Sequence, residues 1–295
     1  MSDLDKSQKS KDIIGRAMMQ EDESIVLDLE AHDHRTDIQG KGQLIYRPGD
    51  ANYREILHHL KNIKPGNWQM VQSFDIDGSS QPDKTLDKSQ DKKDANPDAS
   101  DQTVDVIVPA SQDFQDKVQQ TYRAMSPEVQ KIVDGHSKIE PVNKVTDALP
   151  ELKNQKPRGW PPGSTWDSVD GAYSPSRKAI VVAEEVKDTN QNWVKSRRME
   201  PVLRHEVGHA VDDALGGFSK SQPFKDAYDA DVPGISKADQ ISLEYFLQPG
   251  DAGRSEAFAE SVANKNGGAT GGTTFEKSFA KTIDSADQAI KSYKP

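Results

Sequence analysis

A polar stretch in the first half of the sequence divides the chain into two unequal parts. Residues 81–103, QPDKTLDKSQDKKDANPDASDQT, contain only Leu86, Ala95 and Ala99 as apolar side chains. A segment of this composition cannot bury enough apolar surface to offset the entropy of folding, so we interpret residues 76–103 as a disordered linker. Each folded core is then expected before the linker or after it.

The part before the linker is too short to be stable by itself. Residues 1–24 are polar and weakly patterned, and we expect a flexible tail there. Residues 25–75 are typical of two strands followed by a short helix, which predicts a small α+β module of unknown role. A core of roughly fifty residues is marginal, so we expect this module to be appended to the second part or docked on it. His58 and His59 are interpreted as surface residues, and His32 and His34 could chelate a metal only weakly because no partner ligand is in view.

The overall composition narrows the possible partners. The net charge is −10 and no long basic block is present, so nucleic acid is not expected as a partner. Cysteine is absent, which leaves histidine and carboxylate side chains to hold any metal. The N-terminal residues lack the apolar core of a Sec signal peptide, and no apolar run of about 18 residues predicts a membrane span. We therefore expect a cytoplasmic protein or one exported by a non-Sec route; the oligomeric state is not indicated.

The longer part, residues 104–295, contains a helix that carries two histidines on one face. The stretch MEPVLRHEVGHAVDDALGGF predicts a helix that ends at Gly216. His205 and His209 are one turn apart, so their imidazoles can reach a single Zn²⁺ ion. The opposite arc of this helix is apolar and predicts packing into a core: Leu203, Val207, Ala210 and Ala214.

Glu206 follows the first histidine and completes the pattern H-E-x-x-H. At the edge of the histidine face, a carboxylate can accept a proton from a water molecule that attacks a carbonyl group. Gly208 costs ~1 kcal/mol relative to alanine inside a helix, which indicates that a neighbouring group approaches closely there. The alternative is an ordinary surface helix with two incidental histidines.

A second motif, RSEAFAESVANK, supplies two glutamates at the same helical spacing. A catalytic zinc keeps three protein ligands, and Glu256 is the candidate for the third. Glu260 lies one turn further on and could orient a histidine or the first carboxylate. Two alternatives stay open: Glu260 is the ligand instead, or both glutamates form a solvated acidic stripe.

HEVGHAVDD followed by SEAFAES resembles the catalytic domain of the anthrax lethal factor-like zinc peptidases, a group that includes the Pro-Pro endopeptidases. The resemblance covers roughly residues 104–295 and leaves out the first hundred residues. It implies an α+β fold of the zincin (gluzincin) type, with a small mixed sheet, an active-site helix and a C-terminal helical subdomain. It also implies one zinc ion per chain, a protein or peptide substrate, and the roles given above for the two histidines and the three glutamates.

The resemblance implies two further site residues. Asp213 matches an aspartate of the family and is expected to hold an imidazole N–H, although an aspartate there could equally face water. The family's oxyanion-stabilising tyrosine falls on Pro249 in this sequence. Tyr245, four residues earlier, is therefore the expected donor, and Tyr173 is a weaker candidate.

Residues 179–183 are interpreted as an edge strand that pairs with the substrate backbone, as substrates of such peptidases commonly do. The leading functional hypothesis is a zinc-dependent endopeptidase with Glu206 as general base. One alternative is a binding or toxin-associated module that keeps the zincin fold without catalysis, although an intact Glu206 argues against it. Another is a zinc hydrolase that acts on something other than peptides.

Overall fold

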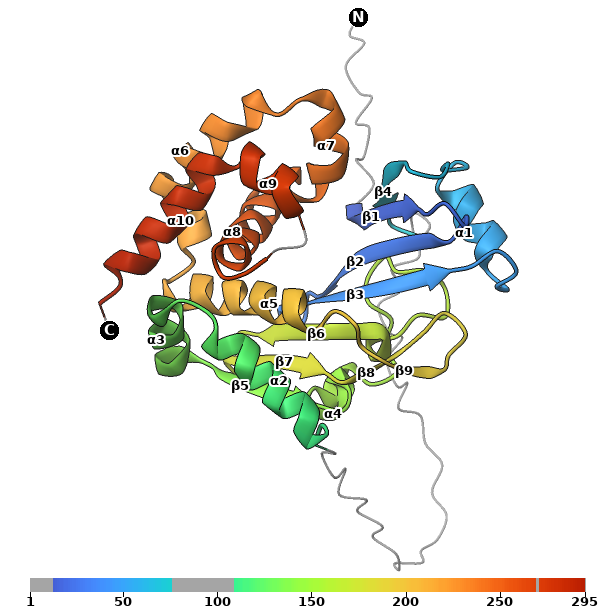
Figure 1. Ribbon diagram of the computed structural model, residues 1–295, viewed down its shortest axis with the longest axis horizontal. Coiled ribbons are helices and arrows are strands. Elements are labelled where there is room, and N and C mark those ends of the chain that lie inside the picture. The colour runs from blue at the N-terminus through green and yellow to red at the C-terminus, as the bar shows by residue number, and fades with distance from the viewer. Residues whose placement is uncertain (1–12, 76–108, 269–270, 295) are drawn as a thin grey trace, which may run out of the picture.

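The computed structural model describes residues 13–75, 109–268 and 271–294 (Figure 1). Within these ranges a seven-stranded mixed sheet has the order β4-β1-β2-β3-β6-β7-β5. Helices cover it, so the predicted α+β class is confirmed. The strands are β1 (Ile13–Met19), β2 (Ile25–Asp33), β3 (Ile38–Tyr46), β4 (Trp68–Gln72), β5 (Lys138–Val142), β6 (Val169–Ser174) and β7 (Ala179–Ala183).

The helices follow mostly in the second part of the chain. Four of them begin after serines whose side chains accept a hydrogen bond from a backbone amide of the first turn, as N-caps do: Ser111, Ser126, Ser221 and Ser236. The helices are α1 (Tyr53–His59), α2 (Gln112–Arg123), α3 (Pro127–His136), α4 (Val145–Ala148), α5 (Met199–Ala214), α6 (Gln222–Asp231), α7 (Lys237–Leu243), α8 (Asp251–Lys265), α9 (Gly272–Ser278) and α10 (Ala280–Ser292). A hairpin joins β8 (Glu185–Lys187) to β9 (Trp193–Lys195), and a 3-10 turn, η5 (Glu244–Leu247), precedes α8. None of the described helices is long and apolar enough to cross a membrane.

Strands from both parts of the sequence join in the one sheet. β3 pairs antiparallel with β6, with Lys41 opposite Gly171. The expectation of a flexible tail over residues 1–24 is wrong for residues 13–19, which form β1 between β2 and β4. Most residues of β1 (IIGRAMM) are apolar, but they do not alternate regularly with polar residues, so no clear strand pattern is visible there from sequence. The predicted linker, residues 76–103, lies outside the described ranges, and the domain boundaries stay a prediction.

The strand expected at the edge of the sheet lies in its interior. β7 pairs antiparallel with β6 and parallel with β5, so the expectation that residues 179–183 receive the substrate backbone is wrong. All five residues of β7 are buried. Such an uninterrupted apolar run is typical of a strand covered on both faces. Whether β7 lies at the edge of the sheet or inside it depends on its pairing with residues 138–142, which the sequence does not reveal.

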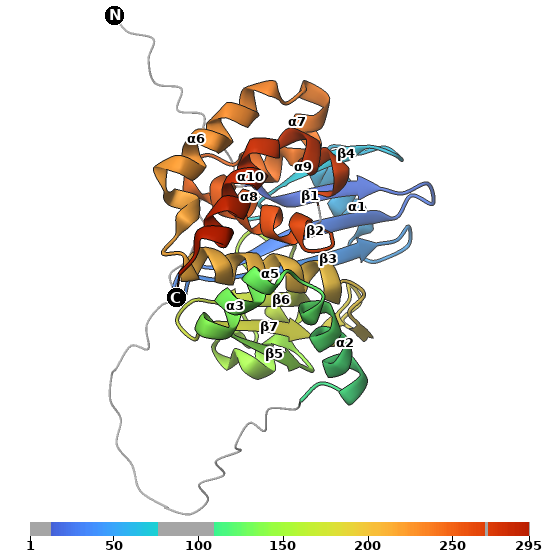
Figure 2. The same cartoon turned by 60° about the vertical axis from the view of Figure 1, so that its left-hand side comes forward.

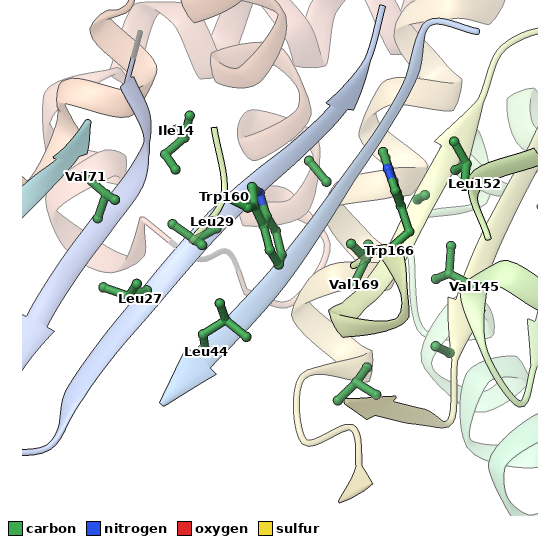
Figure 3. Close-up of a cluster of buried hydrophobic side chains, with 14 of the residues drawn as sticks. Ile14, Leu27, Leu29, Leu44, Val71, Val145, Leu152, Trp160, Trp166 and Val169 are labelled. Atoms are coloured by element: carbon green, nitrogen blue, oxygen red, sulfur yellow. The ribbon is translucent and has the colours of Figure 1, made fainter. Parts of the chain in front are cut away.

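One apolar core spans the two parts of the chain. Figure 3 shows Trp160 beside Leu29 of β2, with Trp166 and Val169 further along the same face. Trp160 is completely buried, and its indole N–H donates a 2.7 Å hydrogen bond to the backbone carbonyl of Glu30. The strands before residue 76 therefore share their core with the part that follows residue 108.

Helix α5 lies against the opposite face of the sheet. Figure 1 shows α5 along β6, with the C-terminal helices on its far side, and Figure 2 shows α2 and α3 beside it. Helix α8 comes very close to α5 at Gly208, where a Cβ atom would lie 2.5 Å from the Cα of Ala259. From sequence, Gly208 is expected to allow a close contact. In the structure, it allows the backbone of α8 to approach α5.

The first strands turn a charged face toward α5 and η5. Along β2, Leu27 and Leu29 enter the shared core, whereas Asp28 and Glu30 alternate with them and point to the other face. Lys41 of β3 is the direct cross-strand partner of Glu30. From sequence alone, the charged face of these strands would be expected to face solvent. In the structure, it lies under the C-terminal helices.

Candidate metal centre

Two imidazoles and one carboxylate converge between α5 and α8. The Nε2 atoms of His205 and His209 are 3.1 Å apart, and the Nε2 of His205 lies 3.0 Å from Oε2 of Glu256. Oε1 of the same glutamate is 3.6 Å from the Nε2 of His209. One ligand atom from each of the three residues lies within 4.8 Å of the others, and all three residues are buried. The structure thus brings together a set that could bind a metal ion.

The helices explain this convergence. His205 and His209 are one turn apart on α5, and Glu256 and Glu260 are one turn apart on α8. The close crossing at Gly208 brings the two pairs face to face. Local spacing therefore sets each pair, and the helix crossing sets the distance between the pairs.

Glu260 contacts the back of the first histidine. Its Oε2 lies 3.1 Å from Nδ1 of His205, and its Oε1 accepts a hydrogen bond from the backbone N–H of Gly271. With a carboxylate at Nδ1, that nitrogen carries the proton and Nε2 is left to face the other ligand atoms. The structure brings Glu256, rather than Glu260, to the Nε2 atoms of both histidines.

Glu206 is buried next to this cluster without a hydrogen-bond partner for either carboxylate oxygen in the described part of the chain. Burial raises its pKa well above the ordinary value, and the positive charges of His205 and Lys41 offset only part of the shift. A buried carboxylate that lacks partners is costly to the fold. The fold therefore keeps a carboxylate at this position although the carboxylate gains no hydrogen bond from the described residues.

The site favours positive charge at the position between the ligands. Burial and the charge of Lys41 lower the pKa of His205, but hydrogen bonds to Glu256 and Glu260 prevail and raise it to about 9. Burial raises the pKa of Glu256, yet the charge of His209 and the hydrogen bond with His205 bring it well below its usual range. The same negative charges that stabilise a proton on His205 would stabilise a divalent cation.

Tyr245 reaches the site from η5. Its hydroxyl lies within hydrogen-bonding reach of the carboxylates of Glu256 and Glu30, and burial, followed by the charges of these two carboxylates, raises its pKa well above 10.0. The side chain therefore stays a protonated donor. Pro249, where the family pattern would put the tyrosine, follows four residues later, so a longer turn keeps a tyrosine beside the metal ligand.

The other two residues expected at the site, Asp213 and Tyr173, contact each other instead. The hydroxyl of Tyr173 donates a 2.6 Å hydrogen bond to Oδ2 of Asp213, which also lies 3.0 Å from Nε2 of His136. The structure therefore does not bring Asp213 to either imidazole of the metal cluster. Asp213 follows His209 by one turn, but its short side chain ends against β6 and α3.

Sequence reasoning missed two charged residues of the site, Glu30 and Lys41. The ammonium group of Lys41, 3% exposed, forms an ion pair with Glu30 and lies 4.0 Å from Oε2 of Glu256. It also lies 5.0 Å from the centroid of the Tyr245 ring. One sequence signal could have found them. Charged residues alternate with apolar residues in the first strands, and these strands are too few to form a stable domain alone, so their charged face has to contact another part of the protein.

The fold and the site together define an α+β domain with a buried His-His-Glu cluster able to hold a metal ion. Residues 99–265, more than half of the 295 residues, match the family model described as anthrax toxin lethal factor, N- and C-terminal domain. The chain belongs to this lethal factor-like family. The match includes α5 and α8 but not the strands that carry Glu30 and Lys41. A search of curated proteins gave no match.

Proposed function

We propose that the protein is a zinc-dependent endopeptidase of the gluzincin type. The observation that carries the proposal is Glu206, a buried carboxylate beside the convergent His-His-Glu cluster that has no hydrogen-bond partner among the described residues. A purely structural site gives no reason to keep such a group. Membership of the lethal factor-like family supports the same reading.

The donor set suits zinc. Two imidazole nitrogens and one carboxylate oxygen are a common ligand set of catalytic zinc, which keeps a further position open. His205, His209 and Glu256 would hold the ion, one per chain. When bound, zinc would polarise the carbonyl group and lower the pKa of a water molecule to roughly 7.

The chain's own residues would carry the proton transfers. Glu206 accepts a proton from the attacking water as the water oxygen bonds to the carbonyl carbon, and then gives it to the amide nitrogen as the C–N bond breaks. The hydroxyl of Tyr245 donates a hydrogen bond to the carbonyl oxygen as that oxygen becomes negative. Glu260 keeps the Nδ1 proton of His205 in place throughout.

The test is the Glu206→Gln variant, assayed on casein and on a mixed peptide library, with zinc per chain measured by elemental analysis after dialysis. Cleavage should fall by about 10²–10⁴-fold because the base is lost, while zinc content stays that of the wild type. Glu200→Gln, on the exposed part of the same helix, is the matched control and should cleave normally.

Zinc-loaded wild type that cleaves no peptide would overturn the proposal. That result would favour a hydrolase for other substrates or a zinc-binding module without catalysis. Equal cleavage by the wild type and Glu206→Gln would mean that Glu206 is not the general base.

A further inference from the structure

Two charged side chains enter the metal site from strands that lie outside the family match. Glu30 on β2 and Lys41 on β3 are cross-strand partners, and both point to the face of the sheet that α5 and η5 cover. The side chain of Lys41 is 4% exposed, so its charge is withdrawn from water. Burying a charge is costly unless its remaining contacts are favourable, and Lys41 has two such contacts at the metal site, Oε2 of Glu256 and the ring of Tyr245.

The contacts of this ion pair converge on Tyr245. The phenol hydroxyl lies within reach of the carboxylates of Glu30 and Glu256, and the ammonium of Lys41 lies 5.0 Å from the ring centroid. Phe246 packs against the same ring edge-on, with centroids 5.4 Å apart. The ring and the hydroxyl are thus held by groups from β2, β3 and α8, while the tyrosine itself is carried by a 3-10 turn.

We propose that the Glu30–Lys41 ion pair is a positioning element of the catalytic site, which holds the Tyr245 hydroxyl against the metal ligand Glu256. The inference rests on the proposed function and deepens it, because it assigns a task to strands that the family match does not include. Lys41 neutralises Glu30, and Glu30 then accepts the hydroxyl without leaving an unpaired buried charge. Lys41 also attracts the ring face by a cation–π contact.

The pair surrounds a small space near the site. Glu30, Lys41 and Tyr245 line a cavity of about 20 Å³, together with Arg16, Asp28 and Arg198. A space of this size holds about one water molecule.

The principal variant is the double substitution Glu30→Gln/Lys41→Met in the full chain. Both charges are removed together, so neither is left buried and unpaired. We expect kcat to fall by roughly 10- to 100-fold, the usual effect of losing a supporting partner of a metal site, with KM and zinc per chain unchanged. Gln43→Met is the matched control: it removes a cross-strand hydrogen bond to Asp28 further along the same two strands.

A double-mutant cycle shows whether the pair acts through the tyrosine. Tyr245→Phe alone should lower kcat, and adding Glu30→Gln/Lys41→Met should lower it no further, because the group being positioned is already lost. Fully additive losses would overturn the proposal, since the pair would then act independently of Tyr245. A rise in kcat would overturn it as well, because the strands would then inhibit the site.

A measurement without catalysis keeps the inference separate from the proposed function. With 3-fluorotyrosine incorporated at position 245, the ¹⁹F resonance should shift or broaden in Glu30→Gln/Lys41→Met and stay unchanged in Gln43→Met. If the wild type cleaves no peptide, the proposed function fails, and this resonance alone decides whether the pair positions Tyr245. An unchanged resonance overturns the inference. Should the double variant unfold, Glu30→Gln alone is expected to give a smaller change in the same direction.

Discussion

The candidate metal centre is assembled from two regions that differ in how their residues meet. On α5 and α8, each pair of site residues is one helical turn apart, so local geometry already groups them. On β2 and β3, Glu30 and Lys41 meet only because the strands pair in one register and the sheet then passes under η5. The helices lie inside the family match and the strands outside it. The grouping of the candidate metal ligands thus follows from helix spacing, whereas the surroundings of the candidate site follow from long-range pairing.

The two regions also differ in their hydrogen bonding. On the helices, Glu206 is buried and has no hydrogen-bond partner within residues 13–75, 109–268 and 271–294, which suits the proposed role of accepting a proton during a reaction. On the strands, Glu30 and Lys41 are paired with each other, which suits groups that hold a neighbour in place. This comparison predicts that substitution of the candidate ligands on the helices, His205, His209 and Glu256, changes metal binding, whereas substitutions in the strands leave the metal bound.

Removal of the third ligand should have the largest effect. Glu256→Ala leaves only two imidazoles, so zinc per chain should drop from about one to almost none after dialysis. Elemental analysis measures this directly. Glu276→Ala, at an exposed position of α9, should keep its zinc. Full zinc in Glu256→Ala would mean that another group, such as Glu260, is the ligand.

Loss of the shared core should come next. Trp160→Ala removes a completely buried side chain that packs on the first strands, and should lower the free energy of unfolding by about 3–5 kcal/mol. Urea denaturation followed by circular dichroism measures it. Trp68→Ala, at a position 37% exposed, should cost much less. Equal losses in the two variants would argue that the first strands do not share a core with the second part.

The helix crossing can be tested at a single methyl group. Gly208→Ala forces α5 and α8 apart and should cost about 1–3 kcal/mol, with weaker zinc binding, because the Cβ would lie 2.5 Å from the Cα of Ala259. Chelator competition and denaturation give the two quantities. Gly135 in α3 is the matched control, because a Cβ atom added there would meet open space. Gly135→Ala should therefore raise the free energy of unfolding by about 0.5–1 kcal/mol. A stabilised Gly208→Ala would contradict the close crossing.

The smallest effect is expected at Asp213. Asp213→Asn weakens the hydrogen bond from Tyr173 and should cost about 0.5–1.5 kcal/mol in stability, with zinc affinity unchanged. Thermal denaturation and chelator competition provide the measurements. Asp212→Asn is the comparison, since Asp212 accepts two hydrogen bonds from Ser219. Weaker zinc binding in Asp213→Asn would restore the role in orienting an imidazole that the family resemblance implied.

The sequence predicted the site best where distances along the chain are short. The grouping of His205 with His209, and of Glu256 with Glu260, needs only the period of a helix. The roles proposed for these residues stay predictions that the experiments above test. Asp213 shows the limit of this reasoning, because helix position gives a direction but not the partner that lies there.

The strands were harder to predict for a physical reason. A period of two tells which residues share a face but not which strand pairs with which, so β7 could be taken for an edge strand although β5 covers it. The charged face of β2 could likewise be assigned to solvent. In the folded protein it lies under η5 beside the metal ligands.

The sequence by itself determined the α+β class, the helix that carries the histidines and the identity of the groups able to hold a metal, because composition and helical period are local properties. The tertiary structure alone decided that strands from both ends of the polar stretch share one sheet, and that Lys41 lies beside Glu256. Contacts between residues more than two hundred positions apart depend on strand register and helix crossing, and neither is encoded in a short stretch of sequence.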